Sequence, residues 1–243
     1  MGDYARYALY YAPPYGSALA SFAASWLGWE PETGAVVARP EIEGLPESIE
    51  TLTARPARYG FHATLRAPFR LKEGLTEKAL TAAVFEFCED EKPFDLPRLE
   101  LTNSLGFVSL RPAEPSEDLS AFAMGCVRNF RGFAAPLSEE DLAKRRAIGL
   151  SDRQEEMLQR WGYPFVGEEF RFHMTLTRRL PAPEAETVMA ALRPRLADAL
   201  AEPAQVRELC LFGDPGPEGG DRGGQGSGRG GHFRVIRRFP LKG

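Results

Sequence analysis

The sequence predicts a mixed α+β protein built as two related lobes. Strand and helix signals alternate along the chain, and one phrase, Phe-His-x-Thr-Leu, occurs at Phe61–Leu65 and again at Phe172–Leu176. The chain has 243 residues, 43% of them hydrophobic, which is enough to bury a sizeable core. We therefore expect one bilobal domain over residues 1–243, in which each lobe carries one copy of the phrase.

In the first 130 residues, Tyr- and Leu-rich or alternating segments predict strands at 6–12, 59–71, 96–101 and 105–111. Apolar residues at helical spacing predict helices at 17–27, 76–90 and 115–130. Pro13 ends the first strand, Gly28 closes the first helix, and Pro68 is expected to interrupt the motif strand. Scattered Pro and Gly predict a loop over 34–55, and Asn103-Ser104 predicts a turn.

After residue 130, Ser138 and Ser151 each precede polar, partly acidic residues typical of a helix start, which predicts a helical insertion over 138–163. Strands are expected at 170–178, 206–212 and 232–241, and a helix at 183–200. The Gly-rich tract 213–231 cannot bury enough apolar surface to hold one conformation, so it predicts a mobile loop. The tract lacks the glycine-lysine pattern of a nucleotide phosphate loop.

The repeated phrase predicts two equivalent polar surfaces. Side chains alternate between the two faces of a strand, so in each copy Phe, the middle residue and Leu would pack while His and Thr share the other face. His62 with Thr64, and His173 with Thr175, are therefore the candidate functional pairs. If the two lobes face one another, both imidazoles point into one cleft.

Two imidazoles on facing strands suit acid-base chemistry, because one neutral ring can accept a proton while a protonated partner donates one. Four arginines share the parity of the histidines and would border the same face, namely Arg58, Arg66, Arg171 and Arg179. Guanidinium groups suit phosphate oxygens. The pattern therefore indicates metal-free cleavage of a phosphodiester or cyclic phosphate, with no cofactor.

Structural interpretations compete with each of these assignments. A single histidine beside Phe is usually packed or on the surface, but that leaves the repeated His-x-Thr unexplained, so the catalytic interpretation is favoured. Thr64 and Thr175 could be ordinary strand residues, and any one arginine is more often a solvated surface charge. Two distant histidines supply too few ligands for zinc, so no metal is expected.

The net charge and the cysteines limit which partners and which cellular compartment we expect. A formal charge of -4 argues against a general polyanion binder. The N-terminal residues lack a signal-peptide pattern, and no stretch has membrane-spanning length. Cys88, Cys126 and Cys210 are widely spaced and odd in number, which suits buried thiols in a reducing compartment. We expect a cytoplasmic protein without a membrane partner; the oligomeric state is open.

The paired His-x-Thr signature resembles the 2H phosphoesterase superfamily, which includes RNA 2′,3′-cyclic phosphodiesterases. The longer strings RYGFHATLRAPFRL at 58–71 and WGYPFVGEEFRFHMTLTRRL at 161–180 resemble the branch described as a putative phosphonate metabolism protein. This resemblance implies a bilobal α+β fold with pseudo-symmetric, mainly antiparallel sheets around a central cleft. It also implies that His62 and His173 are catalytic and that Thr64 and Thr175 bind phosphate.

Three functions remain open. The first is a phosphodiesterase acting on a small phosphorylated or cyclic phosphate substrate, for which the resemblance makes a ribosyl cyclic phosphate the candidate. The second is RNA 2′,3′-cyclic phosphate or RNA-end processing, against which the acidic balance counts. The third is a noncatalytic phosphometabolite-binding protein, which would not need a matched acid and base. The near symmetry of the copies gives little basis for assigning roles; we assign His173 as base and His62 as acid.

Overall fold

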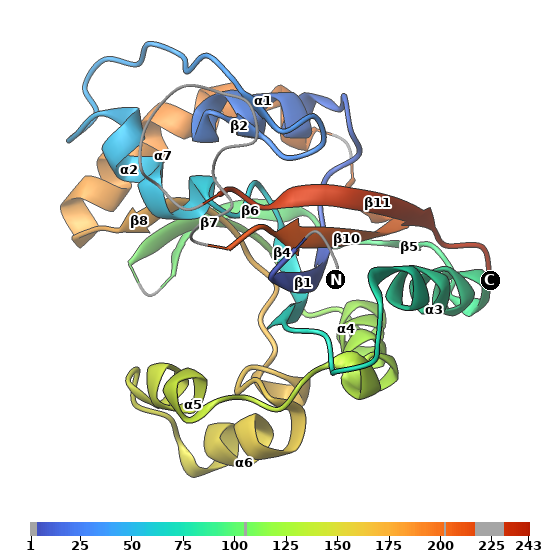
Figure 1. The fold of residues 1–243 in the computed structure, drawn as a ribbon. Coiled ribbons are helices and arrows are strands. Elements are labelled where there is room, and N and C mark those ends of the chain that lie inside the picture. Colours follow the sequence, from blue (N-terminus) through green and yellow to red (C-terminus); the bar gives the residue numbers. More distant parts are fainter. Residues whose placement is uncertain (1–3, 105, 202, 217–230) are drawn as a thin grey trace.

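The computed structural model describes residues 4–104, 106–201, 203–216 and 231–243 (Figure 1). The fold is α+β with antiparallel sheets, as predicted. Two main sheets of four and three strands hold the two motifs, one in each. The Gly-rich residues 217–230, for which a mobile loop is predicted, lie outside the described residues.

The first sheet has the strand order β11-β10-β1-β4 and is antiparallel throughout. Its strands are β1 (Arg6–Tyr11), β4 (Ala63–Phe69), β10 (Glu208–Asp214) and β11 (Arg234–Pro240). Strands from both ends of the chain therefore build this sheet, so the lobes do not correspond to the two halves of the sequence. Strand β4, which carries the first motif, lies at the sheet edge.

The second sheet has the order β6-β7-β8 and is also antiparallel. Its strands are β6 (Leu99–Ser104), β7 (Phe107–Pro112) and β8 (Met174–Arg179). Strand β8, with the second motif, is again an edge strand. Two short pairs complete the strands, β2 (Trp29–Glu30) with β3 (Ala35–Val36) and β5 (Phe94–Asp95) with β9 (Gln205–Val206).

Helices cover one face of each sheet (Figure 1). The second sheet contacts α1 (Ala18–Leu27), α2 (Ile49–Ala57) and α7 (Ala182–Leu196). The first sheet contacts α3 (Glu77–Asp90) and α4 (Glu117–Asn129). Short 3₁₀ turns lie at Arg131–Phe133, Gly167–Glu169 and Asp198–Leu200. No helix in the described part of the chain is long and apolar enough to cross a membrane.

The main hydrophobic core lies between the helices and the sheets, and both motifs contribute to it in the same way. The first, third and fifth residues of each motif are buried in this one cluster, namely Phe61, Ala63, Leu65, Phe172, Met174 and Leu176. The parity prediction is therefore confirmed for the apolar half of each motif. The opposite faces of the two edge strands are left for His and Thr.

Three local predictions need correction. Residues 34–55 were expected to form a loop, but α2 begins after Ser48, whose side chain caps it, and buries Ile49 and Leu52 against β8. Pro68 does not interrupt β4, because an edge strand tolerates the missing N–H. The turn between β6 and β7 falls after Ser104, near Gly106 with φ 83°, instead of at 103–104.

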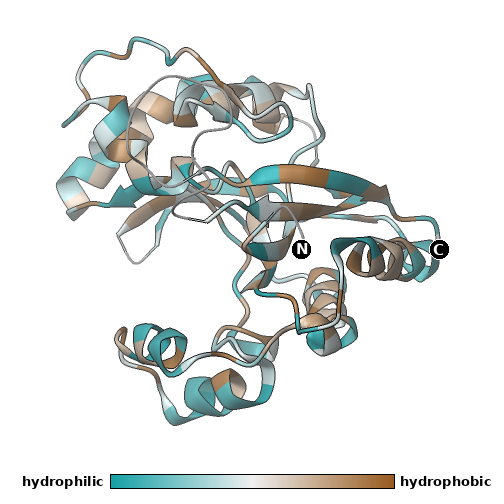
Figure 2. Ribbon diagram, viewed as in Figure 1, coloured by the Kyte–Doolittle hydropathy of each residue, from teal (hydrophilic) through white to brown (hydrophobic). Residues whose placement is uncertain are grey.

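Two helices occupy most of the segment 138–163, α5 (Glu139–Arg146) and α6 (Asp152–Trp161). Each begins after its predicted serine, Ser138 or Ser151, with a reciprocal capping box. Figure 1 shows the pair below the sheets, beside α4, and Figure 2 shows that many of their residues are hydrophilic. Helix α6 is joined to α4 by a small apolar cluster containing Met157 and Val127.

A buried carboxylate ties the first sheet to the segment that leads into the first motif. Asp214, at the end of β10, has 0% exposure. Its two oxygens accept hydrogen bonds from Arg6 at 2.5 and 2.9 Å, from Arg58 at 2.9 Å and from the Gly216 N–H at 3.0 Å. Arg58 directly follows α2, so this cluster fixes the chain four residues before His62.

We expect Asp214→Asn to lower the free energy of unfolding by about 3 kcal/mol, because it removes the buried negative charge that two guanidinium groups share. Urea denaturation measures this loss. Glu47→Gln is the matched control, since Glu47 pairs with Arg178 at a partly exposed site and its loss should cost about 1 kcal/mol or less. Equal losses in the two variants would contradict a structural role for the buried cluster.

Candidate functional site

The two histidines hold the same position and orientation in their motifs. Each directly precedes its edge strand, and each ring donates from Nδ1 to the carbonyl oxygen two residues earlier: His62 to Gly60 at 2.9 Å, and His173 to Arg171 at 2.7 Å. A carbonyl oxygen only accepts hydrogen bonds, so Nδ1 carries the proton in both rings. In the neutral form, the lone pair of each ring is therefore at Nε2.

His62 lies on the face of the first sheet opposite the main core. A second apolar cluster covers that face, formed by Ala8, Tyr10, Ala12, Cys210, Phe212 and Phe233. The His62 ring stacks on Tyr10 with centroids 3.9 Å apart and an interplanar angle of 28°. Tyr59 lies 6.0 Å from His62 and Phe212 lies 6.5 Å from it, again between centroids. Aromatic rings thus surround the imidazole.

This environment disfavours the charged form of His62. Burial lowers the pKa of the imidazole from 6.5 to about 4; the hydrogen bond to Gly60 opposes the shift, and the charge of His173 adds to it. The last contribution requires the two rings to lie near enough for electrostatic interaction. His173 itself is exposed, so water can solvate its imidazolium form. The two copies therefore differ in solvation although their hydrogen bonds match.

Strand β1 contacts both motifs through adjacent tyrosines. Tyr10 stacks on His62, while Tyr11, on the other face of the strand, contacts Phe172 with centroids 5.4 Å apart. The indole N–H of Trp26 in α1 donates to the Leu176 carbonyl at 2.8 Å and holds β8 from its other side. These contacts place the second motif directly against the strand that supports the first.

The two threonines take different surroundings. Thr64 Oγ1 lies 3.4 Å from His62 Nε2, where its hydroxyl can donate to the unprotonated nitrogen. Thr175 pairs in register with Ser109, which in turn pairs with Thr102 across the second sheet. A row of hydroxyl residues therefore crosses this sheet toward the His173 strand. Sequence reasoning missed Thr102 and Ser109, because nothing in the sequence aligns these two strands with the strand of His173.

The arginines of the first motif have separate environments. Arg58 binds the buried Asp214 and lies over the rings of Tyr59 and Phe233, with its guanidinium carbon 5.4 Å from each centroid. Arg58 therefore flanks the aromatic surroundings of His62. Arg66 is only 4% exposed and donates from Nη1 to the Val127 carbonyl at 2.9 Å. It points toward α4 and lines a neighbouring cavity.

The arginines of the second motif are exposed and locally engaged. Arg171 donates from Nη1 to the carbonyl oxygens of Glu168 and Phe170, at 2.6 and 2.7 Å. Arg179 lies over the Phe107 ring at the far end of β8, 5.4 Å from the centroid. No contact of Arg179 joins it to either histidine in the described part of the chain. Arg171 alone lies beside His173, whose ring bonds its carbonyl.

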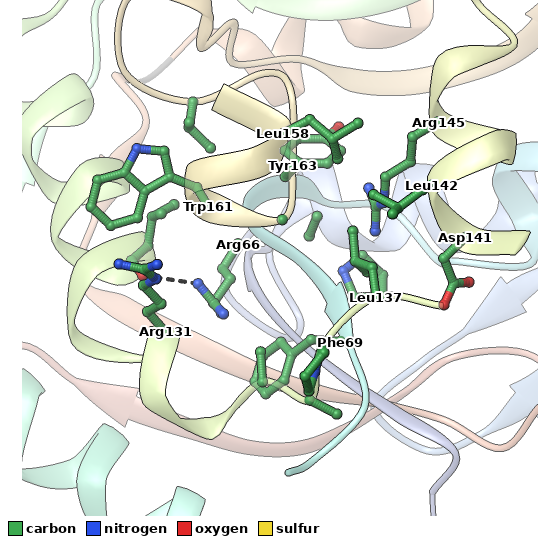
Figure 3. A pocket seen from close by; sticks show the side chains of 18 of the residues that line it. Arg66, Phe69, Arg131, Leu137, Asp141, Leu142, Arg145, Leu158, Trp161 and Tyr163 are labelled. Atoms are coloured by element: carbon green, nitrogen blue, oxygen red, sulfur yellow. Dashed lines mark hydrogen bonds between the residues drawn. The ribbon is translucent and has the colours of Figure 1, made fainter. Parts of the chain in front are cut away.

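A cavity of about 450 Å³ lies beside the first motif, between β4, the end of α4 and the α5–α6 segment (Figure 3). Its lining includes Arg66, Arg145 and Tyr163 but neither histidine. Arg6 of β1, the strand that carries Tyr10, also lines the cavity, so the cavity lies beside the strand that supports His62. Sequence reasoning did not identify Arg145 as a site residue.

Among the residues that the structure describes, no cluster of three or more His, Cys, Asp or Glu side chains has the arrangement of a metal site. The three cysteines are buried free thiols. Burial raises the pKa of Cys88 and of Cys210 to about 12 in each case, so both are protonated at neutral pH. The groups gathered near the motifs are thus imidazoles, hydroxyls, aromatic rings and guanidinium groups.

Residues 64–220 match the family described as "Protein of unknown function (DUF1045)", and the chain belongs to this family. It is similar to two proteins named ribose 1,5-bisphosphate phosphokinase PhnN. The protein from Janthinobacterium sp. (strain Marseille) is 42% identical over 81% of this chain, and the one from Laribacter hongkongensis (strain HLHK9) is 36% identical over 86%. The matches cover 44% and 48% of those proteins, so the chain spans about half the length of these curated relatives.

Solved structures show a weaker likeness. E. coli LigT complexed with 3′-AMP is 15% identical, with a TM-score of 0.42 over 98% of each chain. A structure described as a phosphoesterase is 15% identical, with a TM-score of 0.43 over 99% of each chain. Similarity at this level supports no conclusion about what this chain binds.

We expect His62 to titrate near pH 4 in the folded protein and Tyr10→Ala to move that titration toward 6.5, because removal of the stacked ring admits water to the imidazolium. NMR titration of the histidine ring signals measures both values. Tyr15→Ala is the matched control, because Tyr15 is a tyrosine that is 56% exposed to solvent. A midpoint near 6.5 in the unmodified protein would contradict the assigned burial.

Proposed function

We propose that the chain is a metal-independent phosphoesterase that hydrolyses a cyclic phosphate or small phosphodiester by two-histidine acid-base catalysis. The observation that carries the proposal is the matching pair of Nδ1 hydrogen bonds in His62 and His173, which places the lone pair of each neutral ring at Nε2. The resemblance of the paired motifs to the 2H phosphoesterases supports the same chemistry. Thr64 and Thr175 are the proposed phosphate-binding hydroxyls.

The proposed roles follow from the difference in burial and reverse our assignment from sequence. His62, with its pKa lowered to about 4, is neutral at pH 7, so its Nε2 accepts a proton from the attacking water. His173, which is exposed, acts in its imidazolium form and donates its Nε2 proton to the leaving oxygen of the substrate. The water oxygen bonds to phosphorus, the ester P–O bond breaks, and a phosphate monoester with a free hydroxyl results.

The arginines have unequal parts in this proposal. Arg58 lies over the Tyr59 and Phe233 rings near His62. The backbone carbonyl of Arg171 accepts a hydrogen bond from His173. Their positive charges would favour an anionic phosphate there. Arg179, 5.4 Å from the Phe107 ring at the far end of β8, is better placed for stability than for substrate contact.

The proposed substrate is a ribosyl cyclic phosphate, in phosphonate metabolism. The curated relatives are named for ribose 1,5-bisphosphate, a phosphorylated ribose, and match the chain over about half their length. The resemblance of the long motif strings to a phosphonate-metabolism branch supports the same substrate class. We further propose action in the cytoplasm, where the buried free thiols of Cys88, Cys126 and Cys210 fit a reducing environment.

We expect His62→Ala and His173→Ala each to lower kcat/KM for a cyclic phosphate by about 10²- to 10⁴-fold without unfolding the protein, because each removes one proton-transfer group. The assay uses chelator-treated protein and compares ribosyl cyclic phosphate with an RNA carrying a 2′,3′-cyclic end. Loss of wild-type activity on chelation would contradict the metal-free mechanism. A strong preference for the RNA would contradict the substrate, and full activity in both variants would contradict the site.

The pH dependence of kcat/KM distinguishes base from acid. If His62 is the base, kcat/KM should rise with pH through about 4, where its ring loses the proton, and Tyr10→Ala should move this limb toward 6.5. The Tyr15→Ala variant should leave the limb in place. If His62 were instead the acid, kcat/KM would fall as pH rises through about 4, which would overturn the assignment.

A further inference from the structure

The cavity beside the first motif is strongly basic. Its lining contains seven arginines and one carboxylate, that of Asp141. Three of the arginines have acidic partners: Arg6 pairs with Asp214, Arg70 with Asp141 and Arg146 with Glu155. Within the described ranges the other four make no ion pair, namely Arg66, Arg131, Arg145 and Arg160. The lining of the cavity therefore holds more guanidinium groups than carboxylates.

Arg66 is a buried cation in the lining of this cavity. Its side chain is 4% exposed, its Nε has no hydrogen-bond partner, and its guanidinium carbon lies 4.6 Å from the Phe69 ring centroid. Burial lowers the pKa of Arg66 to about 10, so the group is still a cation at neutral pH. A buried cation with an unused donor is costly unless an anion meets it. Figure 3 shows Arg66 among Arg131, Leu137 and Arg145.

Arg145 brings a second cation from α5. Its guanidinium carbon lies 5.3 Å from the Tyr163 ring centroid, and neither an ion pair nor a hydrogen bond joins it to another described residue. Arg145 and Tyr163 line the cavity together with Arg6 of β1, the strand that carries Tyr10. The α5–α6 segment thus closes the cavity on the side away from β4.

The cavity and the histidines share one strand. Arg66 follows Thr64 by two residues in β4, which corresponds to roughly 7 Å along a strand. The Arg66 side chain turns toward α4, and the spacing along β4 is within the length of a sugar that carries two phosphate groups. A volume of about 450 Å³ suits a sugar phosphate in size. Unpaired guanidinium groups bind phosphate oxygens with charge-assisted hydrogen bonds.

We propose that this cavity binds a second phosphate group, a phosphate monoester, on the same small substrate whose cyclic phosphate is held at His62 and His173. The inference rests on the proposed function for the place of the cyclic group. It narrows the substrate class to a sugar that carries a cyclic phosphate and a separate terminal phosphate. Arg66, Arg131 and Arg145 are the residues that select the terminal phosphate.

A binding experiment without turnover tests the cavity alone. We expect ribose 5-phosphate, measured by titration calorimetry, to bind the wild-type protein, and Arg145→Gln to weaken that binding by about 10-fold. Arg131→Gln, at an exposed position, should also weaken it and guards against a folding defect at Arg145. Lys144→Gln is the matched control, because it removes the same charge one residue away on α5, at a side chain that is 71% exposed and outside the cavity. Equal binding by Arg145→Gln and Lys144→Gln would overturn the proposal.

A kinetic experiment tests the link to the histidines. For ribosyl cyclic phosphate with a terminal phosphate, Arg145→Gln should raise KM about 10-fold, whereas kcat/KM for the analogue without that phosphate should not change. Equal losses for both substrates would overturn the subsite. If wild-type protein hydrolyses neither substrate, the proposed function fails while the calorimetric result still stands. RNA binding that depends on Arg145 and resists competition by ribose 5-phosphate would overturn the small-molecule class.

Discussion

The arrangement of both motifs depends on the alternation of side chains along β1. Tyr10 and Tyr11 are neighbours in sequence but point to opposite faces of the first sheet, as every strand requires. Tyr10 therefore stacks on the first histidine, while Tyr11 packs against Phe172 of the second motif within the main core. One strand thus supports two motifs that come from different sheets and from distant parts of the sequence.

The same arrangement breaks the equivalence of the two copies. Because His62 lies half-buried against Tyr10 on a face covered by aromatic rings, its pKa falls. His173 precedes an edge strand of the smaller sheet and is exposed. The hydrogen bonds of the two rings match, so the two copies differ in what covers the ring. One repeated phrase can therefore hold two imidazoles in different surroundings.

The alternation of side chains along a strand correctly predicted which residues of each motif face the core, where the strands are regular. The apolar residues of both phrases lie in the core, as alternation requires. The prediction that Arg66 shares a face with His62 is wrong. The β1–β4 pairing shifts register on both sides of Leu9, so Leu65 and Arg66 are buried in succession. A bulge of this kind redirects side chains and leaves no mark in composition. Nor could the sequence pair Arg58 with Asp214, since the two are separated by 156 residues.

The bulge that turns Arg66 away from its predicted face also places its guanidinium group in the lining of the cavity. A regular β4 would place Arg66 on the face that carries Thr64; instead, Arg66 is buried against Val127 and Phe69 with an unused Nε. Such burial lowers the stability of the free protein, since no carboxylate among the described residues compensates the charge. A bound anion would pair with the buried guanidinium and restore this stability only while it is bound. The free energy that Arg66 costs in folding would then favour the binding of an anion. The spacing of Thr64 and Arg66, with only Leu65 between them in β4, would then set the distance between the two phosphates of the substrate.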